Sequence, residues 1–127
     1  AKRIEDEFYV FSNFGRKNSN IKVRDWLKVV QEQGAGEILL NSIDNDGLGL
    51  GYDIELLEQI TSDIKIPIII CGGVGDYLDF EKGLKNPKID AVAAANIFHY
   101  RDQSVYLAKK YLYEEGYNVR KPDLLDL

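Results

Sequence analysis

Three apolar runs, each ending in a small-residue or polar loop, constrain the fold of this chain more than any other feature. They begin at Ile38, Ile66 and Ala91, roughly 25 to 30 residues apart, which is about the length of one strand–helix repeat. None of the runs alternates with polar residues, as is typical of parallel strands whose two faces are both covered. The sequence therefore predicts a βα series with its chemistry at the carboxyl ends of the strands.

Shorter patterns predict the other elements. A strand is expected over residues 7–12, which are rich in aromatic and β-branched residues; residues 15–20 are predicted as a basic, polar loop, and no element is assigned to the polar residues 1–6. Helices are expected where apolar residues recur at helical spacing and an aspartate or glycine marks an end. The first helix has Val23, Trp26, Leu27 and Val30 on a single face. The second begins near Asp53, with Leu56, Leu57 and Ile60 inward, and the third begins near Asp76, with Tyr77, Phe80 and Leu84 on one side. The last begins near Ser104, with Val105, Ala108 and Leu112 inward and Gly116 as its stop.

The length of 127 residues fits a single domain, predicted to span residues 1–127 without a linker. A closed barrel of this type needs eight βα units and about 250 residues. The chain is therefore expected to form either an open parallel sheet or half of a barrel. A half barrel would need a partner half, a second copy of itself or further sequence, and a chain that begins at Ala1 without methionine is expected to lack its natural start.

Composition excludes several classes of protein. The net charge of −5 argues against broad nucleic-acid binding, which depends on neutralising phosphates. No apolar run approaches the roughly 20 residues that span a bilayer, and no signal peptide opens the chain. A single cysteine fits a reducing compartment, so a cytoplasmic protein is expected. No cluster of histidine and cysteine has metal-ligand spacing, and neither a metal nor a cofactor is predicted.

The loops after the second and third apolar runs suggest a phosphate site. Cys71 is followed by Gly72 and Gly73, and Ala95 and Asn96 follow the third run. Glycines let backbone N–H groups approach an anion, and the helix beginning near Asp76 would add the positive end of its dipole. A tight strand-to-helix turn explains a lone Gly-Gly pair equally well. Barrels of this class commonly bind phosphate between their last two such loops, which favours the anion site.

Other polar residues have less specific patterns. Asp46, followed by Gly47, is interpreted as a functional carboxylate, whereas Asp44 is interpreted as turn chemistry. Glu37 opens the first run and is either a solvated strand end or a charge at the closed end of a barrel. Nothing in the sequence brings Cys71 and His99 together, so a Cys–His nucleophile is not favoured.

Several segments resemble the cyclase subunit of imidazole glycerol phosphate synthase, a (βα)8-barrel family of histidine biosynthesis. The resemblance rests on residues 34–40, 42–47, 51–53 and 68–75 and on the Phe98-His99 pair. It covers nearly all of the chain but only the C-terminal half of the family's barrel, roughly strands 5–8. The resemblance implies a half barrel, with residues 7–12 in a hairpin that extends the fifth loop.

The resemblance also implies an activity. The family's cyclase takes ammonia from a glutaminase partner and converts a bisphosphorylated ribonucleotide into imidazole glycerol phosphate and an aminoimidazole carboxamide ribonucleotide. Two aspartates act as general acid and base. One belongs to the N-terminal half and the other ends the fifth strand, directly before the segment that resembles Ala1-Lys2-Arg3. Neither lies in this chain, which is therefore expected to be inactive alone.

The residues that match the family keep their implied roles here. Gly72, Gly73, Ala95 and Asn96 would hold a substrate phosphate, Asp46 and Gly47 would line the reaction centre, Asn41 would face the substrate, and Glu37 would belong to the charged gate where ammonia enters.

The chain also departs from the family at the strand ends. Asn41, Cys71 and Asn96 replace Thr, Ser and Ser, and Leu48-Gly49 replaces Thr-Lys or Thr-Arg, so hydroxyl donors are lost or replaced. These departures resemble a paralogue branch that works beside a glutaminase and an amidotransferase acting on bacterial surface sugars. Both branches imply a barrel that receives ammonia.

Overall fold

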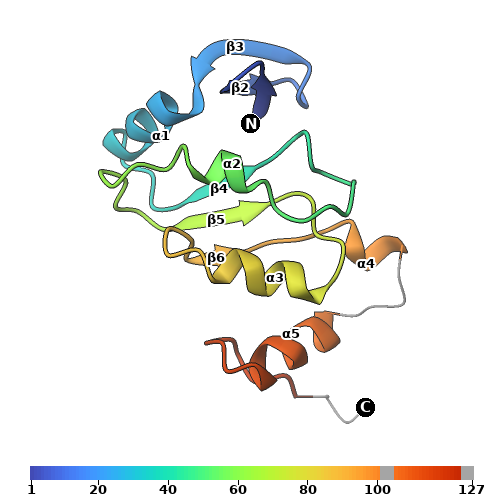
Figure 1. The fold of residues 1–127 in the computed structure, drawn as a ribbon. Coiled ribbons are helices and arrows are strands. Elements are labelled where there is room, and N and C mark those ends of the chain that lie inside the picture. The colour runs from blue at the N-terminus through green and yellow to red at the C-terminus, as the bar shows by residue number, and fades with distance from the viewer. Residues whose placement is uncertain (101–104, 124–127) are drawn as a thin grey trace.

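The computed structural model describes residues 1–100 and 105–123. Its strands form two three-stranded sheets, one antiparallel and one parallel. The antiparallel sheet contains β1 (Lys2–Ile4), β2 (Glu7–Ser12) and β3 (Lys17–Lys22), and the parallel sheet contains β4 (Ile38–Asn41), β5 (Ile68–Cys71) and β6 (Ala91–Val92). The helices are α1 (Val23–Glu32), α2 (Ile54–Leu57), α3 (Tyr77–Leu84), α4 (Ile97–Tyr100) and α5 (Val105–Glu114). Figure 1 shows α3 beside β6, with α5 beyond α3.

The parallel sheet has the predicted order and direction. β4 pairs with β5 and β5 with β6, each in parallel register. Leu40, Ile68 and Ile70 point to one face and are at most 5% exposed, packed in the core that contains Leu56 and Leu57. Burying these side chains is the main stabilising contribution of the sheet.

The opposite face of the parallel sheet is open in the described part of the chain. Leu39 points to that face and is 60% exposed. The sequence predicted that both faces are covered, because the run has apolar residues at every position. The residues are apolar on both faces, but only one face has a packing partner among residues 1–100 and 105–123.

Local capping signals were predicted correctly. The Asp53 carboxylate accepts a hydrogen bond from the Leu56 amide and begins α2. Asp76 begins α3 in a capping box, in which Asp76 and Asp79 each accept from the other's backbone N–H. Gly116 follows α5 with a φ of +83°, as expected for a helix stop.

Other expectations were wrong in part. The polar residues 1–6 and 15–20 contribute to β1 and β3, because pairing with β2 rather than an apolar pattern makes them strands. β5 begins at Ile68 rather than Ile66, β6 ends at Val92 rather than Ala94, and α4 was not predicted. Val105 is 55% exposed instead of inward, whereas Ala108 and Leu112 are buried. Ser104, expected to begin the last helix, lies outside the described residues.

Candidate functional site

The loops that follow the three parallel strands meet at one edge of the sheet, as predicted. Asn41 and Cys71 are paired in register at the ends of β4 and β5. The Asn96 amide, after β6, donates a hydrogen bond to the Gly47 carbonyl, after β4, with an Nδ2–O distance of 3.2 Å. Residues 49 positions apart in sequence are thus in contact at the rim.

A cavity of about 480 Å³ opens between these loops, and we call it the rim cavity. It is lined by Gly47, Leu48, Gly49, Val74, Gly75, Asn96 and Ile97. Within the described residues, the backbone N–H groups of Gly47, Gly49, Val74, Asn96 and Ile97 donate no hydrogen bond. None of the lining side chains is charged. Unpaired backbone N–H groups around a concave surface are a recurrent means of binding anions.

Gly72 and Gly73 lie behind the rim cavity rather than in its lining. Their φ values are +93° and +106°. A Cβ on Gly72 would lie 2.7 Å from the Ser42 carbonyl oxygen, and one on Gly73 would lie 2.1 Å from the Gly51 oxygen. The Gly51 amide donates to the Gly73 carbonyl at 2.8 Å. Close packing of the two loops therefore requires both glycines, whether or not a ligand binds.

Asp79 holds the loop after β5 in place, and the sequence analysis did not select it. Its Oδ2 accepts hydrogen bonds from the Gly75 and Asp76 amides at 2.9 and 3.2 Å, and its Oδ1 accepts from Lys82 Nζ at 3.0 Å. Burial alone would raise the pKa of Asp79, but these donors outweigh it and lower the pKa below the usual value. The Asp-x-x-Asp spacing of a capping box was the available signal.

The Asp79 carboxylate occupies the amides at the start of α3 that were expected to bind an anion. The dipole and the free amides of this helix were expected to face an anion. The amides of Gly75 and Asp76 are instead already bonded to Asp79, and the Asp79 amide donates to Asp76 Oδ1 at 3.3 Å. The amides of the rim lining with no partner among the described residues therefore come mainly from the loops after β4 and β6, with Val74 the one from the loop after β5.

A second polar network, also missed, shapes the loop after β4. Ser42 is 1% exposed, and its hydroxyl donates to Asp53 Oδ2 at 3.1 Å while accepting from the Asn45 amide at 3.3 Å. The Asn45 side chain donates to the Gly51 carbonyl at 3.0 Å. Ser42 lies inside the string that carries the family resemblance, but only the fold reveals that it is buried.

The two aspartates of this loop lie in different surroundings. Asp44 Oδ2 accepts a hydrogen bond from the Arg3 amide at 2.6 Å, so its partner is structural but lies in β1 rather than in its own turn. Asp46 is exposed, and its carboxylate has no hydrogen-bond or ion-pair partner among the described residues. Burial raises the pKa of the Cys71 thiol, and the Asp46 carboxylate adds to this rise, so Asp46 lies near the end of β5. A catalytic role for Asp46 stays a prediction.

The remaining predicted residues lie at both ends of the parallel sheet, and their roles stay predictions. The Asn41 carbonyl accepts a hydrogen bond from the Ala1 amino group at 2.7 Å. Ala95 directly precedes Asn96 but does not line the rim cavity. Glu37 is exposed at the start of β4, the end of the sheet opposite to the rim cavity. No hydrogen bond joins Cys71 to His99 in the described part of the chain.

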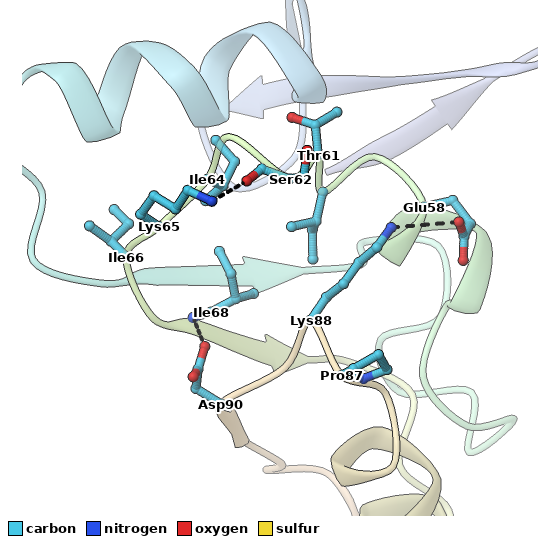
Figure 2. Close-up of a pocket in the computed structure, with 11 residues that line it drawn as sticks. Glu58, Thr61, Ser62, Ile64, Lys65, Ile66, Ile68, Pro87, Lys88 and Asp90 are labelled. Atoms are coloured by element: carbon cyan, nitrogen blue, oxygen red, sulfur yellow. Dashed lines mark hydrogen bonds and ion pairs between the residues drawn. The ribbon is translucent and has the colours of Figure 1, made fainter.

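A larger pocket, of about 730 Å³, lies near the amino end of β5 (Figure 2). Its polar groups bind one another. Lys88 forms an ion pair with Glu58 at 3.6 Å, Lys65 Nζ donates to the Ser62 carbonyl at 2.6 Å, and Asp90 accepts from the Ile68 amide at 2.9 Å. These groups are already paired, in contrast to the free amides of the rim cavity.

The described residues contain neither a metal-binding cluster nor a membrane-spanning helix. No group of three or more His, Cys, Asp or Glu residues among them could hold a metal ion. No helix in residues 1–100 and 105–123 has the length and apolar character needed to cross a membrane.

The fold and the rim cavity define a class of protein in which parallel βα units carry the functional site at the carboxyl edge of the sheet. Residues 1–104 match the family described as "Histidine biosynthesis protein", and the chain belongs to that family. Members of the family fold as TIM barrels, and the parallel sheet with its helices agrees with part of such a barrel.

Relatives give the resemblance more detail. The chain is 44% identical to the imidazole glycerol phosphate synthase subunit HisF of Thermotoga sp. (strain RQ2) over 94% of its own length and 47% of the relative. It is 41% identical to the subunit of the same name from Chlorobaculum tepidum, over 94% of this chain and 48% of the relative. The predicted resemblance is thereby confirmed, and the chain spans about half the length of the curated relatives it matches.

Proposed function

We propose that this chain supplies the rim phosphate site of an ammonia-using cyclase of histidine biosynthesis. In this proposal it forms roughly strands 5–8 of a (βα)8 barrel and takes part in making imidazole glycerol phosphate and an aminoimidazole carboxamide ribonucleotide. The HisF relatives are named as subunits of imidazole glycerol phosphate synthase, which supports the reaction. The exposed Leu39 and the open face of the parallel sheet support a half barrel, which the rest of a barrel or a second copy would cover.

The observation that carries the proposal is the set of unpaired amides around the rim cavity. Gly47, Gly49, Asn96 and Ile97 line that cavity, and their backbone N–H groups have no partner among the described residues. A phosphate has oxygen acceptors for several such donors and needs no basic side chain when they converge. In this proposal Ala95, Gly72 and Gly73 hold the surrounding backbone in position, and Asn41 and Asp46 face the rest of the substrate.

The proposal separates the two ends of the parallel sheet. Phosphate binding and Asp46 belong to the carboxyl end, whereas Glu37, at the amino end, belongs to the gate through which a glutaminase partner delivers ammonia. In this proposal the rest of the barrel supplies the principal acid–base pair, so the chain alone is expected to be inactive. The predicted cytoplasmic setting stays a prediction.

A second candidate is a non-catalytic ammonia conduit in a system that modifies surface sugars. It is favoured by the side-chain amide of Asn96, which already donates to the Gly47 carbonyl, and by Leu48, which is 59% exposed in the lining of the rim cavity. An apolar side chain there makes the rim cavity less suited to a bisphosphorylated substrate.

An ammonium-dependent assay distinguishes the two candidates. The protein that carries this chain is mixed with the bisphosphorylated ribonucleotide and an ammonium salt, and release of the aminoimidazole product is followed. The cyclase proposal predicts turnover, with kcat falling about 10-fold or more in Asp46→Asn if its carboxylate assists proton transfer. Asp25→Asn, an exposed aspartate on α1, is the matched control and should leave kcat unchanged. Absence of turnover with ammonium would contradict the cyclase and favour the conduit.

A further inference from the structure

The turn between β2 and β3 combines an unfavourable backbone with an exposed aromatic ring. Asn13, Phe14 and Gly15 have successive φ values of +51°, +58° and +77°. Left-handed conformations are unfavourable for residues other than glycine, and a bulky side chain is a rare occupant. The Phe14 side chain is 101% exposed, so no packing contact compensates for this backbone. Strained residues of this kind often mark functional positions.

This turn is fixed against the loop that leads to the rim cavity. A Cβ built on Gly15 would lie 3.3 Å from Cδ1 of Ile43, which is the second residue after β4. The Ile43 amide donates to the Ala1 carbonyl at 2.8 Å, and the Arg3 amide donates to Asp44. Figure 1 shows the β2–β3 turn at the end of the molecule toward which the β5 arrow points. The antiparallel sheet thus holds Phe14 at the end that carries the rim cavity.

Free positive charge is concentrated at the same turn. Arg16 and Lys17 are exposed and form no ion pair with any described residue. Lys22 and Arg24, farther along this region, are both paired with Glu7. The whole chain has a net charge of −5, so two unpaired cations beside an exposed ring are a local exception. A flat ring and a pair of cations match a ligand that joins a heterocycle to anionic groups.

We propose that Phe14 determines specificity for the ring of the phosphorylated ligand, by stacking on a flat nitrogen heterocycle while Arg16 and Lys17 attract its anionic groups. The inference rests on the proposed function, because the ligand is the one whose phosphate occupies the rim cavity. It adds that the antiparallel hairpin is a ligand-contacting arm. The left-handed backbone is retained because it holds the ring away from the protein, where a ligand can reach it.

This inference can be tested with two ligands, of which one has the heterocyclic ring and the other lacks it. Calorimetry on the protein that carries this chain compares aminoimidazole carboxamide ribonucleotide with ribose 5-phosphate, which has the phosphate but no heterocycle. Phe14→Ala is expected to lower the affinity for the ring-bearing nucleotide about 10-fold, the size of one base–aromatic stack. The affinity for ribose 5-phosphate should fall less than about 2-fold. Phe14→Tyr should restore the nucleotide affinity. Leu78→Ala, another exposed apolar residue (51%), is the control and should change neither affinity.

A glycine variant separates a ligand role from a structural one. Phe14→Gly relieves the left-handed backbone, so its melting temperature should equal or exceed that of the wild type, while nucleotide affinity falls as in Phe14→Ala. An equal loss of affinity for both ligands, or no loss of affinity for the nucleotide, would overturn the inference but would not contradict the rim site. Failure of the wild-type protein to bind either ligand would overturn the proposed function and this inference with it.

Discussion

Replacing Gly73 by alanine is expected to destabilise the fold by about 3 kcal/mol or more, the range of severe steric and backbone strain. The new Cβ would lie 2.1 Å from the Gly51 oxygen and 3.0 Å from the Asn45 Cβ, and the residue would keep a φ of +106°. The neighbour in the closest contact is backbone, which cannot rotate away. Denaturant unfolding of the two proteins would measure the loss as a shift in midpoint.

Gly36→Ala is the matched control for this experiment. A Cβ on Gly36 would meet nothing within 4 Å, and its φ lies outside the left-handed region. The midpoint should therefore stay the same or rise slightly, because alanine restricts the unfolded chain. Equal midpoints for the Gly73 and Gly36 variants would show that the loops after β4 and β5 do not pack as described.

The same geometry affects a more direct test of the phosphate site. From the sequence, Gly73→Asp is expected to weaken a phosphate ligand by placing a carboxylate in the anion site. In the structure, any side chain at Gly73 first meets the Gly51 carbonyl. A loss of affinity in that variant would therefore mix ligand repulsion with disruption of the loop, and amides that line the rim cavity are better probes.

Asp79→Asn is expected to cost about 2 kcal/mol at neutral pH, as for hydrogen bonds to a charged buried group. Asparagine offers one acceptor oxygen, whereas the carboxylate uses both of its oxygens to bind Gly75, Asp76 and Lys82. Asp25→Asn, on an exposed aspartate, should cost far less. Equal stability of the two variants would contradict the role assigned to Asp79.

The pH dependence of this loss has a definite sign. Hydrogen bonds outweigh burial and hold the folded pKa of Asp79 below that of an ordinary aspartate, so the unfolded chain binds the proton more tightly. The stabilisation is therefore complete above the unfolded pKa of about 4 and is lost as the pH falls through the folded pKa. Unfolding curves of wild type and Asp79→Asn should differ most from pH 5 to 7 and converge in more acidic solution.

Local sequence patterns predicted the parallel part of the fold well. The order of the strands, the aspartates that begin α2 and α3, and the glycine after α5 depend on local patterns, so the sequence carries their signal. β1 and β3 lack such a signal because their residues are polar and become strands only by pairing with β2. α4 is too short for a helical period to appear in the sequence.

The rim cavity was predicted in place but not in detail. Gly72 and Asn96 could be assigned to one edge because the carboxyl ends of parallel strands share an edge. Which glycines line the cavity and which pack behind it depends on the contact of Gly51 with Gly73, between loops 22 positions apart. Gly49 and Ile97, whose amides are free, were not selected for the same reason. Such contacts leave no periodic pattern in the sequence.

The most direct test of the central claim is a phosphate titration followed by NMR of the 15N-labelled protein that carries this chain. If backbone amides of the rim cavity bind the anion, the signals of Gly47, Gly49, Asn96 and Ile97 should shift together along one saturable curve. Signals of Lys65 and Lys88, at the pocket near the amino end of β5, should stay in place. Shifts confined to Lys65 and Lys88, with the rim amides unmoved at saturating phosphate, would contradict the account.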